Sequence, residues 1–231
     1  KLINDVNPDL IINAAAKVGG IVANNTNRTE FILENLKINI NLLESIIPHK
    51  EIKLINLGSS CIYPLNSPNP ISEDNLMNGK LEPTNSPYAM AKLTAIEMGD
   101  ALSQQYGHSI INLMPTNLYG PNDNFSETSS HVIPGLIRRL TIAKHNKDEV
   151  FKVWGTGTPK REFLHVDDLS DAIQFLIESK EVPNLINVGS GQEVTIKKLV
   201  SLLVDITSFE GEVVFDSSMP DGNPRKLLDS S

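Results

Sequence analysis

Residues 52–61 read IKLINLGSSC and join an apolar strand to a Gly-Ser-Ser turn. The run from Ile52 to Leu57 predicts a buried strand of the kind that parallel sheets contain. The turn puts the hydroxyl of Ser59 just past this strand, and open α/β sheets bind ligands outside the carboxyl ends of their strands. This stretch therefore predicts both a fold class and the position of a site within it.

Residues 86–92, SPYAMAK, begin a helix that we predict over Ser86 to Tyr106. Tyr88 and Lys92 are four residues apart, so they lie one turn apart on one face. We expect the Lys92 ammonium to lower the pKa of the Tyr88 phenol and make it a proton donor and acceptor near neutral pH. Such pairs occur by chance on many helices. A strand-end hydroxyl followed by a Tyr/Lys helix is, however, similar to the catalytic arrangement of short-chain dehydrogenases/reductases.

Strand and helix patterns alternate along the chain. The predicted strands are 8–16, 52–57, 109–114, 163–166 and 185–188, and the predicted helices are 35–47, 86–106, 131–143, 168–178 and 196–209. This alternation predicts an α/β fold with a Rossmann-type doubly wound parallel sheet. We expect residues 1–121 to form a Rossmann-type nucleotide-binding domain. Residues 122–231 should form mainly a smaller substrate-binding α/β portion, with some segments returning to the first domain.

A dinucleotide-binding fold should begin with a strand, a Gly-rich turn and a helix. The chain contains no G-x-x-G-x-x-G or G-x-G-x-x-G motif, although the order of elements after Asp9 otherwise follows a Rossmann fold. We therefore expect an N-terminally truncated fold whose first strands precede Lys1. The chain also stops at Ser231 without a closing element, so we expect further residues there.

Composition excludes several classes of protein. The formal net charge of -8 argues against non-specific nucleic-acid binding, so any anionic substrate needs locally placed basic residues. The single cysteine, Cys61, excludes an internal disulfide and suits a reducing compartment. No apolar run approaches the length of a membrane span, and no signal peptide begins the chain. We expect a cytoplasmic protein without nucleic-acid or membrane partners.

Several strings resemble the GDP-L-fucose synthase family of extended short-chain dehydrogenases/reductases. They are NAAAKVGGI (13–21), GSSCIYP (58–64), PTNLYGP (115–121), SHVIP (130–134), the segment from WGTGTP (154–159) to Asp168, and PDGNPRKLLD (220–229). The resemblance covers essentially the whole chain. It implies 3,5-epimerisation of GDP-4-keto-6-deoxy-D-mannose followed by NADPH-dependent reduction of the 4-keto group, in a homodimer.

The resemblance also implies roles for individual residues. Cys61 and His131 match the acid/base pair of the epimerisation, while Ser59, Tyr88 and Lys92 match the reductase residues. Alone, Cys61 reads as a small buried hydrophobe and His131 as a helix N-terminal residue. The matched cofactor-binding positions are Leu57, Gly58, Ser59, Ser60, Lys92, Pro115, Thr116, Asn117, Leu118 and His131.

Arg139, Trp154, Arg161 and Lys226 match the family's substrate contacts. Arg139 could also belong to a solvated basic helix face, and Trp154 could belong to the core. Arg161 falls in a Gly/Pro-rich stretch that we expect to be a loop, which favours a ligand role.

His165, Asp167 and Asp168 could suggest a metal site. A His and two Asp at a strand-to-helix junction more often form a helix N-cap, and we predict no metal. Two alternatives to the family's reaction stay open: another nucleotide-sugar epimerase, dehydratase or reductase of the superfamily, and a non-catalytic nucleotide-sugar-binding relative.

Overall fold

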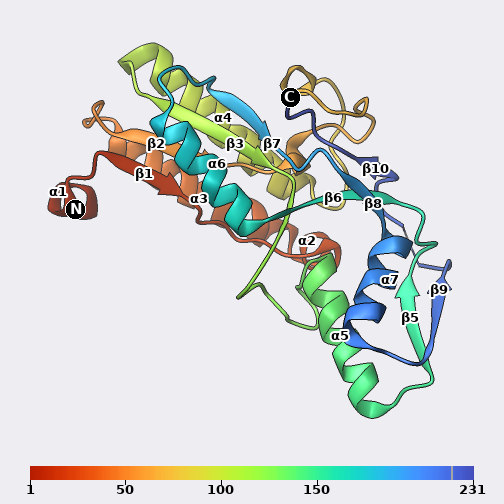
Figure 1. Ribbon diagram of the computed structural model, residues 1–231. Helices are drawn as coiled ribbons and strands as arrows, with labels where there is room; N and C mark the ends of the chain where they lie inside the picture. The colour runs from red at the N-terminus through yellow and green to blue at the C-terminus, as the bar shows by residue number, and fades with distance from the viewer. Residues whose placement is uncertain (220) are drawn as a thin grey trace.

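Four parallel strands form the central sheet, in the order β1-β2-β3-β7 (Figure 1). They are β1 (Leu10–Asn13), β2 (Lys53–Leu57), β3 (Ile110–Pro115) and β7 (Leu185–Val188). All of β3 is buried, as expected of a strand covered on both faces. The computed structural model describes residues 1–219 and 221–231, so Pro220, the first residue of the last family motif, lies outside the described residues.

Helices cover both faces of this sheet. On one face, α3 (Arg28–Ile46) and α4 (Ser86–Tyr106) contribute Leu43 and Leu102 to a core with Leu54 of β2. On the other face, α6 (Val166–Glu178) packs Leu169 against Ile55 and neighbouring β3 residues. Successive residues of β2 thus enter opposite cores, and the predicted doubly wound α/β fold is confirmed.

A row of buried asparagines crosses the sheet on the α3/α4 face. Asn13, Asn56 and Asn112 share one register across β1, β2 and β3. Asn13 Nδ2 donates to Asn56 Oδ1 at 2.9 Å, and Asn56 Nδ2 donates to Asn112 Oδ1 at 3.1 Å. The row thus links the three side chains inside an otherwise apolar layer, although Asn112 Nδ2 at its end has no partner among the described residues.

The later part of the chain adds two small sheets. In one, β5 (Val150–Trp154) pairs in parallel with β9 (Glu212–Asp216) beside α5 (Val132–Asn146) and α7 (Ile196–Thr207), around a separate apolar core (Figure 1). In the other, β6 (Lys160–His165) lies between β4 (Asn117–Tyr119) and β10 (Arg225–Lys226), and β8 (Glu193–Thr195) runs antiparallel to β6.

Every predicted strand and helix is present, and the bounds of α4 and β7 are those predicted. The prediction missed α1 (Leu2–Val6), α2 (Ile21–Thr26), two 3-10 turns (Ser60–Ile62 and Glu73–Asn75), β4, β5, β8, β9 and β10. Of these, β5 alternates buried Phe151 and Val153 with exposed neighbours, a period-two pattern visible in the sequence. Within the part of the chain that the structure describes, no helix combines the length and apolarity needed to span a membrane.

Candidate active site

The Gly-Ser-Ser turn is held against the carboxyl end of β3. Gly58 N–H donates to the Leu113 carbonyl at 2.7 Å, and a Cβ at Gly58 would collide with Met114. Ser59 caps the following 3-10 turn, where its Oγ accepts from Cys61 N–H at 3.2 Å. Any larger residue at position 58 would therefore require the buried Met114 side chain to move, and the close approach keeps Ser59 at the end of β2.

Helix α4 brings Tyr88 and Lys92 to the same place. Lys92 is 3% exposed, and its Nζ donates to the Leu57 carbonyl at 2.7 Å. The same Nζ lies 6.0 Å from the centre of the Tyr88 ring, and Phe31 of α3 packs edge-on against that ring. The strand-end turn and the Tyr/Lys helix, predicted to act together, are therefore adjacent.

The expected effect of Lys92 on Tyr88 is wrong for this structure. Burial raises the pKa of Tyr88 above its usual value, nearby Cys61 raises this pKa further, and a side-chain hydrogen bond with Ser59 opposes the rise. Burial also lowers the pKa of Lys92 to about 8. Desolvation of the phenolate is the largest effect and Lys92 does not offset it, so Tyr88 is neutral at pH 7 and able to donate a proton.

The two acid/base candidates have different surroundings. Cys61 is half-buried, and its thiol is close enough to Tyr88 and Arg161 to influence the pKa of both. His131 is the exposed N-cap residue of α5; partial desolvation of its ring lowers its pKa, and the Asp123 carboxylate opposes this shift. Cys61 thus lies with the Ser59, Tyr88 and Lys92 group, while no hydrogen bond among the described residues joins it to His131.

Two of the basic residues that are candidates for substrate binding, Arg161 and Lys226, are neighbours. Arg161 lies in β6, not in the loop that the sequence suggested, and stands in register with Lys226 of β10. The Gly/Pro-rich stretch ends earlier, and Lys160 to His165 pair with strands on both sides. Burial lowers the pKa of Arg161, and Asp221 opposes this shift. A half-buried arginine beside a lysine makes a cationic edge suited to an anion.

The other two substrate candidates lie on the α5/β5 unit. Arg139 donates to the Lys152 carbonyl, and its guanidinium lies 5.0 Å from the centre of the Phe151 ring. It is therefore engaged by its neighbours and not part of a freely solvated face. Trp154, at the end of β5, is 53% exposed and does not belong to the core.

The cofactor candidates follow the carboxyl ends of two adjacent strands. Leu57 ends β2 and Gly58 to Ser60 follow it, while Pro115 ends β3 and Thr116 to Leu118 follow it. Thr116 Oγ1 and Asn117 Nδ2 both donate to the Glu162 carbonyl, at 3.2 and 2.8 Å. Ser60 is buried, and Leu118 pairs with Leu164 of β6.

These residues fit a dinucleotide. An ammonium carries three donors, and among the described residues Lys92 Nζ has one hydrogen-bond acceptor, the Leu57 carbonyl. A buried cation with donors to spare, at the carboxyl ends of parallel strands, suits the hydroxyls of a ribose.

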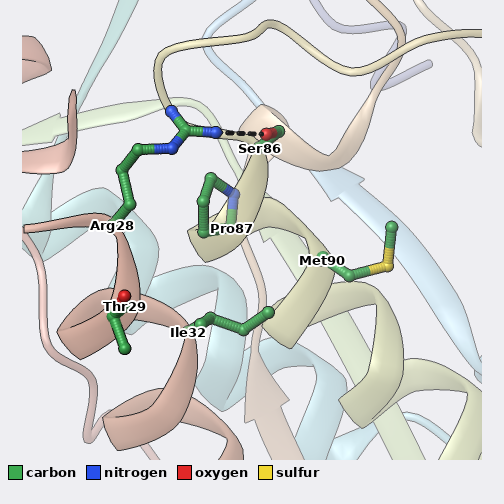
Figure 2. A pocket seen from close by; sticks show the side chains of 6 residues that line it. All are labelled: Arg28, Thr29, Ile32, Ser86, Pro87 and Met90. Atoms are coloured by element: carbon green, nitrogen blue, oxygen red, sulfur yellow. Dashed lines mark hydrogen bonds between the residues drawn. The ribbon is translucent and has the colours of Figure 1, made fainter.

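An apolar hollow lies outside this site. Its volume is about 360 Å³, and Figure 2 shows that it opens between the first turns of α3 and α4, where Arg28 donates to Ser86 Oγ at 3.3 Å. Ile32, Pro87 and Met90 give it an apolar wall. It contains none of the candidate catalytic residues and is separate from the site.

The helix-cap interpretation of His165 is confirmed. His165 Nδ1 accepts from Asp167 N–H at 3.2 Å at the start of α6, and Asp167 and Asp168 occupy the first turn. Across residues 1–219 and 221–231, no three His, Cys, Asp or Glu side chains are grouped so that they could hold a metal ion.

Sequence reasoning missed two carboxylates beside the site. Glu162 is fully buried in β6. Asp221 accepts from Thr156 N–H at 2.7 Å and from Thr156 Oγ1 at 2.8 Å, which fastens the segment before β10 to the turn after β5. The available signal for Glu162 was a carboxylate at an inward position of an alternating strand.

Comparison with known proteins gives the site its context. Residues 1–189 match the NAD dependent epimerase/dehydratase family. The chain is 53% identical to GDP-L-fucose synthase 1 of Arabidopsis thaliana over 97% of its own length and 69% of that protein. It is 46% identical to the GDP-L-fucose synthase of Escherichia coli (strain K12), covering 96% of this chain and 72% of that protein.

A solved structure agrees with these relatives. A GDP-L-fucose synthetase from Naegleria fowleri bound to NADP superposes with a TM-score of 0.87 at 28% identity, over 99% of this chain and 71% of that one. The chain therefore belongs to the NAD dependent epimerase/dehydratase family and, within it, to the GDP-L-fucose synthases.

Proposed function

We propose that this protein is a GDP-L-fucose synthase, which epimerises GDP-4-keto-6-deoxy-D-mannose at C3 and C5 and then reduces its 4-keto group with NADPH. The observation that carries the proposal is the grouping of Cys61 with Ser59, Tyr88 and Lys92 at the carboxyl end of β2. A simple reductase needs the last three residues, and the thiol adds acid/base capacity beside them.

Epimerisation needs one group to remove a proton and another to return one to the opposite face. The 4-keto group acidifies the protons on C3 and C5. The lowered pKa of His131 favours a neutral imidazole at pH 7, which can accept a proton. Cys61 is the partner that would return one, since a thiol can exchange its proton near neutral pH.

Reduction needs a proton on the C4 oxygen. When bound, NADPH supplies the hydride to C4. Ser59 Oγ accepts from Cys61 N–H, and its O–H, which hydrogen-bonds with Tyr88 in this structure, would turn to donate to the C4 oxygen. Tyr88, held neutral by burial, donates the proton, and Lys92 holds the nicotinamide ribose hydroxyls.

These roles divide cofactor binding and substrate binding between two parts of the chain. We assign NADP binding mainly to residues 1–121, with His131 contributing from beyond it, and substrate binding mainly to residues 122–231. Arg161 and Lys226 would bind the diphosphate, which an acidic protein must hold with local cations. Arg139 and Trp154 would add contacts from the α5/β5 unit.

We further propose a cytoplasmic homodimer. A catalytic thiol must stay reduced, which favours the cytoplasm. The α3/α4 surface supports a self-interface, because Met90 is 47% exposed beside the apolar hollow.

Two variants separate the two half-reactions. Cys61→Ser keeps the shape of the side chain but removes its acid/base capacity, so epimerisation should fall about 10²–10⁴-fold while reduction remains. The enzyme should then release reduced sugars with the wrong stereochemistry, which NMR of the products identifies. Tyr88→Phe should show the reverse, with deuterium still entering C3 and C5 from heavy water but no reduced product.

Wild-type product formation decides between the alternatives. A wild-type enzyme that inverts C4 or eliminates water would instead be a 4-epimerase or dehydratase. If Cys61→Ser makes GDP-L-fucose at the wild-type rate, Cys61 is only a packed residue. Binding of GDP-sugar without any turnover would indicate a non-catalytic relative.

A further inference from the structure

Glu162 is a carboxylate with no exposed surface, in the interior of β6. Its Oε1 accepts from Gly191 N–H at 2.8 Å, and its Oε2 accepts from Leu228 N–H at 3.1 Å. The Ser190 hydroxyl is a weaker third donor at 3.5 Å. None of the ion pairs formed by the described residues includes Glu162. Burial of a carboxylate without a cation is unfavourable, so the backbone N–H groups that bind Glu162 compensate for its lost hydration.

The Leu228 contact is one of the anchors of the segment that carries Lys226, beside a backbone bridge between Ile71 and Leu228. Strand β10 is only two residues long, so its own pairing with Lys160 and Arg161 holds it weakly. Glu162 binds the chain two residues beyond Lys226, and Asn69 Oδ1 accepts from Leu227 N–H at 2.7 Å on the way. Glu162 follows Arg161 directly, so one strand both carries the first cation and fixes the second beside it.

The same residue also contacts the cofactor side of the site. Its carbonyl accepts from Thr116 and Asn117 just after β3, and its carboxylate accepts from Gly191 in the turn after β7. A Cβ at Gly189 would collide with this carboxylate, so the turn approaches it as closely as a backbone can. Three segments from distant parts of the sequence therefore meet at Glu162.

We infer that Glu162 is a positioning residue for substrate binding: its carboxylate sets where Lys226 stands beside Arg161, so that the two cations together receive a nucleoside diphosphate. The inference rests on the proposed function for the assignment of these cations to the diphosphate. Glu162 itself touches neither substrate nor cofactor and acts through Lys226.

The test replaces Glu162 by its isosteric amide. In Glu162→Gln, a neutral amide oxygen can accept from only one of the two backbone N–H groups and is a weaker acceptor than a carboxylate, which should loosen the Lys226 segment. We expect the Kd for GDP, measured by calorimetry, to rise about tenfold or more. The Kd for NADPH should be unchanged. The control is Glu178→Gln, the same chemical change at an exposed position of α6, and it should alter neither Kd.

A double variant distinguishes positioning from general support of the fold. If Glu162 acts through Lys226, adding Glu162→Gln to Lys226→Ala should change the Kd for GDP by less than about twofold. Additive losses, or equal loss of GDP and NADPH binding, would overturn the inference. If circular dichroism shows that Glu162→Gln is unfolded, Glu162→Asp, which withdraws the carboxylate by one methylene, should show the same selective loss.

The two proposals fail in different ways. Unchanged GDP affinity in Lys226→Ala would overturn the inference together with the diphosphate assignment. Formation of GDP-L-fucose by the wild-type protein tests the proposed reaction separately.

Discussion

Burial of the Lys92 ammonium in the candidate site lowers the stability of the folded protein. The side chain is 3% exposed, and burial lowers its pKa from 10.5 to about 8. The unfolded chain therefore binds more protons than the folded one between these two values. By linkage, stability should rise with pH across this window, and below about pH 8 the full cost of burying the ammonium is present.

We therefore predict that Lys92→Met stabilises the protein at pH 7 while abolishing reduction. The pKa shift corresponds to roughly 3 kcal/mol, and the lost bond to Leu57 offsets about 1 kcal/mol, which leaves a gain of about 2 kcal/mol. Urea unfolding should show this gain shrinking between pH 8 and pH 10.5. Lys37→Met, at a side chain that is 65% exposed, is the control and should show no such pH dependence. A loss of stability in Lys92→Met at pH 7 would contradict this account.

Among secondary-structure elements, those with a long pattern could be predicted from the sequence. Helix α4 matches its predicted bounds because its pattern and flanking residues agree there, and the short strand β7 matches too, whereas α3 begins seven residues before the predicted helix 35–47. Strand β10 has two residues and is held by β6, by Glu162 and by the bridge from Ile71 to Leu228, all of them distant in the sequence, so no local pattern encodes it. For the same reason, the sequence could indicate Arg161 and Lys226 only through resemblance and could not show that they stand in register.

The asparagine row makes a prediction about the central sheet. Asn56→Ala would leave Asn13 Nδ2 without its acceptor and Asn112 Oδ1 without its donor, both buried. Each orphaned group costs about 1–3 kcal/mol, so the free energy of unfolding should fall by about 2–6 kcal/mol. Thermal and urea unfolding measure it. Asn78→Ala, which removes an exposed amide bonded to the Asp74 carbonyl, is the control and should cost far less. Comparable losses in the two variants would refute a cooperative role for the row.

At the scale of the whole molecule, the α3/α4 surface bears on assembly. Met90 and Ile32 face the hollow shown in Figure 2, and neither belongs to the buried core. A second copy of the chain packed on this apolar wall would remove it from contact with water. The candidate site lies apart from this wall, so assembly should be separable from chemistry.

We predict that Met90→Glu shifts the protein from dimer to monomer in sedimentation velocity. A carboxylate on the interface would have to be desolvated twice in a symmetric dimer. Phe175→Glu makes a similar change on α6, at a side chain that is 70% exposed, and should leave the assembly unchanged. If the wild type is already monomeric, or if both variants behave alike, the α3/α4 surface is not the interface.

Because strand β10 lies late in the sequence, the two parts of the site are completed at different times during synthesis. Ser59, Tyr88 and Lys92 leave the ribosome more than a hundred residues before Lys226 and Leu228. Until the segment from Arg225 to Leu228 has left the ribosome, Glu162 Oε2 lacks its Leu228 partner and Arg161 lacks its neighbouring cation. Chains fold from the N-terminus as they are made. The reductase residues can therefore assemble early. The cationic site for the diphosphate of a nucleotide sugar is complete only after Leu228 has left the ribosome.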